Sequence, residues 1–109
     1  MQLISDKNFK DLSDMTVVIA DRFFLARKML ATEEDYLASP DYKDENYDRF
    51  LEKVQTAFAS LSEAERNLIN NEFFFQSYNN WWESIYSKST FYRYKKEAMK
   101  KFLEAFYNA

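Results

Sequence analysis

The sequence of 109 residues contains no glycine and only one proline, and this absence restricts the backbone more than any other feature. Glycine readily takes positive φ, so tight two-residue hairpin turns are disfavoured without it. Glycine-rich loops that hold phosphate groups, such as the P-loop and the dinucleotide-binding fingerprint, are excluded. Apolar residues recur instead at steps of three and four through most of the chain. We therefore predict an all-α fold, a compact bundle of five or six helices forming a single helical domain over residues 1–109.

The chain also lacks cysteine and histidine, and these absences bear on its chemistry. Without cysteine there is no disulfide, thiol nucleophile or cysteine-based zinc site. Without histidine, the most common general base and the most common metal ligand are both missing. We predict that the protein is not an enzyme and that it uses no cofactor or metal ion.

No stretch of about 18 consecutive apolar residues occurs, so no membrane-spanning helix and no membrane partner are expected. The N-terminal residues include acids and lack the basic-then-apolar order of a signal peptide. A cytoplasmic location is the resulting expectation.

Helix ends are marked by small polar residues and by the single proline. Ser13 or Asp14 can cap a long first helix, because a short polar side chain accepts a hydrogen bond from an otherwise unpaired backbone N–H. Pro40 breaks the chain, since proline cannot continue a helix. Ser62 and Glu65 have the spacing of a capping box. The expected elements begin with a helical region over 1–40, which holds a short helix over 6–12 and a long helix over 14–37. A helix over 44–61 follows, and another helix starts at residue 63. A turn over 76–80, a short helix over 81–86 and a last helix capped by Ser87 or Ser89 come after it.

The last three helices follow the order of a helix-turn-helix module, which we place in the region 58–109. The first two helices are expected to bury Leu68, Ile69, Trp82 and Ile85. The last helix carries Phe91, Tyr94, Ala98, Phe102 and Ala105 at helical steps and is expected to turn the first four toward the core. The aromatic residues just before it are expected mainly to pack rather than to stack on bases. The first long helix is expected to pack on this region or to dimerise.

Polar and basic residues occupy the opposite side of the last helix. Ser89, Arg93, Lys96 and Lys100 follow one another at steps of four, three and four, so they share one face. Ser89 and Thr90 can hold a phosphate at the helix start, and Arg93 suits bidentate contact with guanine. Lys96 and Lys100 suit contacts with phosphates. The candidate DNA-binding residues are Lys88, Ser89, Thr90, Tyr92, Arg93, Lys96 and Lys100.

Two stretches of this region resemble those of known DNA-binding proteins. LSEAERNLI, residues 61–69, resembles the opening of the promoter-recognition domain of bacterial sigma factors. SIYSKSTFYRYKKEAMKKF, residues 84–102, resembles the turn and recognition helix of that group. It is also similar to the S-x-S-T-x-Y-R-x-x-K-x-A run of phage late-gene transcription activators, matched by Ser87, Ser89, Thr90, Tyr92, Arg93, Lys96 and Ala98. The resemblance covers residues 58–106 and implies a DNA-binding transcription regulator.

We therefore predict a regulator that reads duplex DNA with its basic C-terminal helix, with RNA polymerase and a second copy of the chain as further partners. Residues 88–109 hold six basic and two acidic side chains, whereas residues 1–50 hold seven basic and 11 acidic ones. The alternative is a non-catalytic helical module that binds a basic protein through its acidic half and its exposed aromatic residues. A continuous positive face around Arg93 favours DNA, and a face interrupted by Glu97 or Glu104 favours a protein partner. A solvated basic surface is the simplest alternative for Lys100 and Lys101, since cations are favoured near a helix C-terminus.

Overall fold

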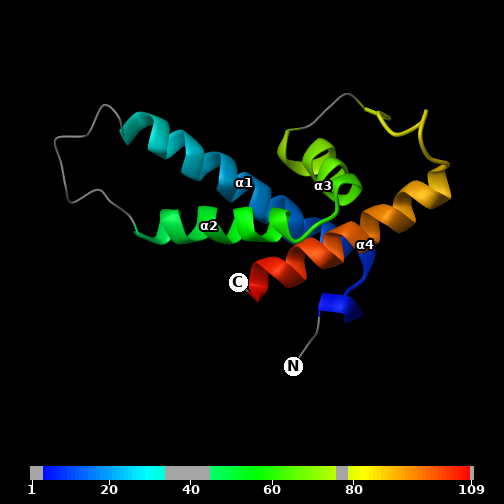
Figure 1. Ribbon diagram of the computed structural model, residues 1–109, viewed down its shortest axis with the longest axis horizontal. Helices are drawn as coiled ribbons and strands as arrows, with labels where there is room; N and C mark the ends of the chain where they lie inside the picture. The colour runs from blue at the N-terminus through cyan, green and yellow to red at the C-terminus, as the bar shows by residue number, and fades with distance from the viewer. Residues whose placement is uncertain (1–3, 34–44, 76–78, 109) are drawn as a thin grey trace.

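The computed structural model describes residues 4–33, 45–75 and 79–108, in which every regular element is helical (Figure 1). This confirms the all-α class. The helices are fewer than predicted, because the described residues form four α-helices with two short helices beside them. In chain order they are the 3-10 helix η1 (Ile4–Asp6), α1 (Phe9–Glu33), α2 (Glu45–Ala59), α3 (Glu63–Ile69), the π-helix η4 (Asn70–Phe74) and α4 (Lys88–Tyr107).

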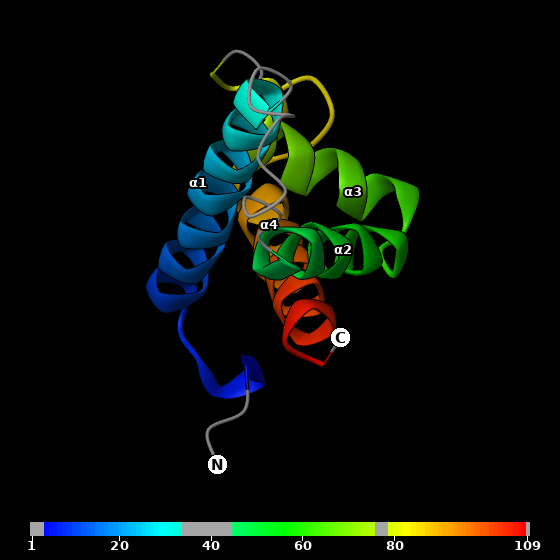
Figure 2. The same ribbon diagram turned by 90° about the vertical axis from the view of Figure 1, so that its left-hand side faces the viewer.

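Helix α4 runs through the centre of the bundle and contacts η1, α1, α2 and α3. Figure 2 shows α1 on one side of α4, with α2 and α3 on the other. The Phe102 ring contacts those of Phe58 and Phe74, at centroid distances of 5.3 and 5.7 Å, and the latter two rings contact each other at 4.9 Å. The residues of α4 that enter the core are Phe91, Ala98, Met99, Phe102, Leu103 and Phe106. The core therefore forms around α4.

Helix α1 begins at Phe9, five residues before the predicted start at residue 14. The Asn8 side-chain oxygen accepts a hydrogen bond from the Asp11 N–H at 2.8 Å, and its carbonyl accepts from the Leu12 N–H at 3.0 Å. Both the predicted cap at Ser13 or Asp14 and the separate helix over 6–12 are therefore wrong. The physical reason is that an earlier start places Leu12 in the core, where it is fully buried. The predicted end at residue 37 and the break at Ser39-Pro40-Asp41 lie outside the described residues.

Helices α2 and α3 agree with the sequence pattern. The predicted helix over 44–61 corresponds to α2, and Phe50 and Val54 of its apolar stripe are buried. The capping box at the start of α3 is confirmed, since the Ser62 N–H donates to Glu65 at 2.9 Å and the Glu65 N–H donates to the Ser62 hydroxyl at 3.2 Å.

Helix α3 passes directly into η4, whose wider turn was not predicted. The Phe75 N–H donates to the Asn70 carbonyl, five residues earlier, at 2.8 Å. Phe73 and Phe74 are both buried, whereas Phe75 is exposed. The π-helical turn therefore brings two adjacent phenylalanines into the core.

The short helix predicted over 81–86 is not formed. Residues 79–85 make hydrogen-bonded turns instead, in which Asn80 takes a positive φ of 62°. The Trp82 ring stacks on Phe91 with 4.3 Å between centroids, and this packing holds the segment against α4 rather than in a helix of its own. Ile85, which was expected to be buried, is 61% exposed. Within the described residues the middle helix of a helix-turn-helix is therefore absent, and residues 76–78 of the predicted turn lie outside them.

Candidate nucleic-acid interface

The candidate interface begins at the N-terminus of α4, where Ser87 is the N-cap. The Ser87 hydroxyl accepts a hydrogen bond from the Thr90 N–H at 3.3 Å and donates to the Thr90 hydroxyl at 2.9 Å. Of the two predicted caps, Ser87 is thus the one used. Ser89, one residue into the helix, is exposed to solvent. Since the Thr90 N–H and hydroxyl are already engaged, Ser89 is the better placed of the two residues to meet a phosphate.

Apart from Lys95, the basic side chains of the N-terminal half of α4 lie outside the core. Lys88 and Arg93 are exposed and Lys96 is half-buried. None of these three side chains forms an ion pair with another residue in the part of the chain that the structure describes. The Arg93 guanidinium lies over the Tyr94 ring, 5.5 Å from its centroid. Their charges are therefore available to an external anion.

The remaining cations of α4 are paired with acidic side chains. Lys100 lies 3.5 Å from Glu97, and Lys101 lies 2.8 Å from Glu65. Glu97 and Glu104 are themselves exposed. The positive face around Arg93 is therefore confined to the N-terminal half of the helix and is interrupted in the C-terminal half.

Lys95 belongs to the interior packing and not to this face. Its ammonium donates to Glu72 at 2.8 Å, and the Trp81 indole N–H donates to the other oxygen of that carboxylate at 2.9 Å. The Lys95 and Glu72 side chains are only 15% and 18% exposed. The Lys95 ammonium also lies 5.2 Å from the centroid of the Phe73 ring. One feature of the sequence indicates this cluster: Glu72 is an acidic residue directly before the three phenylalanines at positions 73–75.

Tyr94 occupies a different position from that predicted, whereas Tyr92 is exposed as predicted. Tyr92, a candidate DNA contact, meets the Phe9 ring of α1 edge-on at 5.8 Å and keeps part of its surface exposed. Tyr94 was expected in the core but is 45% exposed. Met99 and Leu103 are buried instead, because α4 is covered from both sides and its core face is turned toward α1 and α2.

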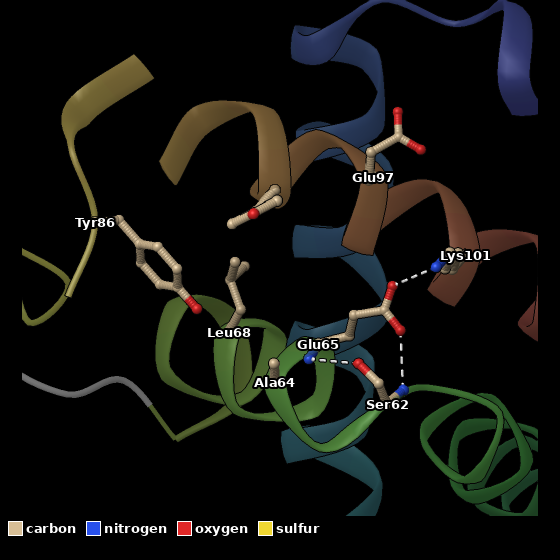
Figure 3. Close-up of a pocket in the computed structure, with 8 residues that line it drawn as sticks. Ser62, Ala64, Glu65, Leu68, Tyr86, Glu97 and Lys101 are labelled. Atoms are coloured by element: carbon tan, nitrogen blue, oxygen red, sulfur yellow. Dashed lines mark hydrogen bonds and ion pairs between the residues drawn. The ribbon is translucent and has the colours of Figure 1, made fainter. Parts of the chain in front are cut away.

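The Glu65–Lys101 ion pair joins the first turn of α3 to α4 (Figure 3). Partial burial opposes ionisation of Glu65, but the hydrogen bonds from Lys101 and Ser62 and the charge of Lys101 outweigh it. Together they lower the pKa of the Glu65 carboxyl below its ordinary value. The hydrogen bond to Glu65 and the charge of Glu65 raise the pKa of Lys101. Both shifts favour the ionised pair.

The chain matches no protein-family model, and comparisons with curated proteins and with solved structures also find no match. In the described ranges no helix has the length and apolar character needed to cross a membrane. The same ranges hold no group of three acidic side chains placed to bind a metal ion. Function is therefore inferred from the geometry and charge of the molecule itself.

Proposed function

We propose that the protein is a transcription regulator that binds duplex DNA with the N-terminal half of α4. The observation that carries this proposal is the division of charge along α4: Lys88, Arg93 and Lys96 have no acidic partner among the described residues, whereas Lys95, Lys100 and Lys101 each have one. Phosphate neutralisation by unpaired cations supplies most of the affinity of proteins for DNA. This division favours the N-terminal half as the contact, whereas the interruption by Glu97 and Glu104 farther along the helix favours a protein partner, the second candidate function.

The position of this half is also suited to a groove. Its first turns form the right-hand end of the molecule in Figure 1, beside the 79–87 segment. An α-helix is about 10–12 Å across with its side chains, which matches a major groove about 12 Å wide. In this arrangement Arg93 is directed to base edges, and Lys88, Ser89 and Lys96 to phosphates.

Lys100 takes a secondary role in this proposal. It lies on the same face as Lys96 but is paired with the exposed Glu97 at 3.5 Å. The Glu97 side chain is 55% exposed and that of Lys100 is 21% exposed. An ion pair at this distance with one exposed partner contributes little free energy, so a phosphate can compete for the ammonium. Tyr92 and Thr90 lie beside the contact, and RNA polymerase and a second copy of the chain remain proposed partners.

The test compares two double variants that remove the same net charge. Arg93→Ala with Lys96→Ala removes two unpaired cations, whereas Lys10→Ala with Lys101→Ala removes two cations that are paired with acids at 2.9 and 2.8 Å. Binding to a fluorescein-labelled mixed-sequence duplex is measured by anisotropy over a series of salt concentrations. The first variant should reduce the slope of log K against log salt by about one, because Lys96 is its phosphate contact, and the second should leave the slope nearly unchanged. Equal losses in both variants, or binding that does not depend on salt, would contradict the proposal.

A second candidate function is binding to another protein, and an apolar surface on α1 favours it. Val18 is 65% exposed, and Phe24 meets the exposed Phe75 ring at 6.0 Å. We define the α1 surface as Val17, Val18, Phe24, Leu25 and Phe75. Contiguous exposed apolar residues commonly mark sites of protein association.

The first partner to test at the α1 surface is a second copy of the chain. Val18→Glu with Leu25→Glu places charges on the surface without altering buried residues. If the chain dimerises there, light scattering should give a mass that rises with concentration for the unaltered protein and stays monomeric for the variant. A monomer at every concentration would exclude the homodimer. DNA binding should be unchanged by this variant, which separates the two candidate functions.

A further inference from the structure

A pocket of about 450 Å³ lies between α1, α2 and the continuous helix that α3 and η4 form. Its volume is within the usual range for sites that bind small organic molecules, roughly 300–1,000 Å³. The cations of the proposed DNA contact do not line it, and Phe75 is its one lining residue from the α1 surface. The two candidate functions therefore leave this pocket without a role.

The walls of this pocket are mostly aromatic. Phe23 of α1, Phe58 of α2 and Phe74 of η4 line it, and the Phe74 ring lies 5.2 Å from that of Phe23 and 4.9 Å from that of Phe58. The Phe75 ring, 6.5 Å from that of Phe23, also lines it and is 54% exposed. Phe75 therefore leaves apolar surface at the pocket, which a ligand with an apolar part can remove from water.

The polar residues that line the pocket are three amides and one cation. Gln55, Asn67 and Asn70 supply the amides, whose NH2 groups can donate hydrogen bonds. Arg66 of α3 supplies the cation, and it forms no ion pair with another described residue, including Glu63 one turn before it. Among the described residues no acidic side chain lines the pocket. The positive charge of Arg66 is therefore uncompensated there.

A second guanidinium lies beside the pocket. That of Arg27, on α1, is 5.7 Å from the centroid of the Phe23 ring, which is part of the lining. Arg27 likewise forms no ion pair within the ranges that the structure describes. Arginines from two different helices thus place positive charge at one apolar pocket. This charge attracts an anionic ligand and repels a cationic one.

We propose that this pocket binds an organic carboxylate with an apolar ring or chain. The apolar part packs against Phe23, Phe58 and Phe75, which removes its surface from water. The carboxylate meets Arg66, because a planar guanidinium can donate two parallel hydrogen bonds to the two carboxylate oxygens. The amides of the lining are further donors for those oxygens. This ligand site goes beyond both candidate functions and depends on neither of them.

A nuclear magnetic resonance titration of the full chain with phenylacetate tests the proposal. Benzyl alcohol serves as the neutral comparison and benzylammonium as the cationic one, since both carry the same ring. Phenylacetate should give saturable shifts of the Asn67 side-chain amide and of the methyl signals of Val54, which also lines the pocket. It should bind roughly two- to five-fold more tightly than benzyl alcohol, and benzylammonium should bind most weakly. The absence of saturable shifts, or benzylammonium binding as tightly as phenylacetate, would overturn the proposal.

Matched variants then identify the group that attracts the carboxylate. Arg66→Gln should weaken phenylacetate binding roughly two- to five-fold, as expected for an exposed charge contact, and should leave benzyl alcohol binding unchanged. Arg49→Gln removes the same charge from an exposed position of α2 outside the lining, and it should change neither. If Arg66→Gln has no effect on phenylacetate, or if both variants weaken its binding equally, the pocket does not recognise the carboxylate as proposed.

A third variant tests the apolar part of the site. Phe75→Ala shortens an exposed side chain and should weaken the binding of phenylacetate and benzyl alcohol alike, because both lose the same ring contact. Unchanged binding of both ligands would place them elsewhere on the molecule and would contradict the proposal.

Discussion

Single residues in this protein often serve two structural functions, and only the local one is visible in the sequence. Glu65 is predictable as the third residue of a capping box because the box depends on a spacing of three. Its ion pair with Lys101 at 2.8 Å joins residues from different helices, so no local spacing indicates it. The same holds for Lys95, whose partner Glu72 is 23 residues earlier. A basic side chain on a helix is therefore readily misjudged as part of a charged surface.

Because the pKa of Glu65 is lowered, the free energy of unfolding should decrease as the solution becomes acidic. A carboxyl whose folded pKa lies below its unfolded value stabilises the fold above the unfolded pKa, and this contribution is lost as pH falls through the folded pKa. Glu65→Gln preserves the capping geometry but removes the charge. Its free energy of unfolding, measured with urea, should be lower than that of the unaltered protein at neutral pH and should converge with it in acid. Glu52→Gln, an exposed control on α2, should follow the unaltered protein throughout.

The Lys95–Glu72 pair should show strong coupling because both side chains are largely buried. Glu72→Ala leaves the Lys95 ammonium without its carboxylate and should lower the free energy of unfolding by about 1–3 kcal/mol. Lys95→Met keeps the apolar stem of the side chain, so the double variant should cost less than the sum of the two single changes. Denaturant unfolding of all four proteins completes the cycle. Additive costs would mean that the pair does not act as a unit.

At the scale of elements, apolar spacing was sufficient to predict α2, α3 and α4, because each buries one continuous stripe. Apolar spacing was insufficient where several residues could begin a helix. At α1, Asn8, Ser13 and Asp14 are all residue types that can cap a helix, and only Asn8 does so. Apolar spacing also failed over 81–86, because packing of Trp82 on Phe91 outweighs local helix preference there. The order expected of a helix-turn-helix thus depends on contacts that a local pattern does not contain.

The start of α1 can be tested by comparing two capping residues. Asn8→Ala removes the side-chain acceptor for the Asp11 N–H and should lower the free energy of unfolding by about 1 kcal/mol. Ser13→Ala lies inside the helix and should be neutral or stabilising, because alanine has the higher helix propensity. Thermal or urea unfolding measures both. A larger loss from Ser13→Ala than from Asn8→Ala would instead support the later start.

At the scale of the whole molecule, α4 forms the centre of the core and also carries the proposed DNA contact. The sequence identified several of its buried residues, including Phe91, Ala98 and Phe102. It did not identify the central place of the helix, since that depends on how four separate helices pack together. Because α4 touches the other helices, its outer basic face is held in position by the entire core.

That arrangement predicts a single cooperative unfolding transition, as expected for one domain. Phe102 is fully buried against Phe58 and Phe74, and Phe102→Ala should lower the free energy of unfolding by about 3–5 kcal/mol. Helicity, followed by circular dichroism, should be lost at the same denaturant concentration as the fluorescence of Trp81 and Trp82, in both the unaltered and the altered protein. A tryptophan transition that precedes the loss of helicity would show that the 79–87 segment detaches before the bundle unfolds. In that case the core would not hold the start of α4 in the position that the proposed DNA contact requires.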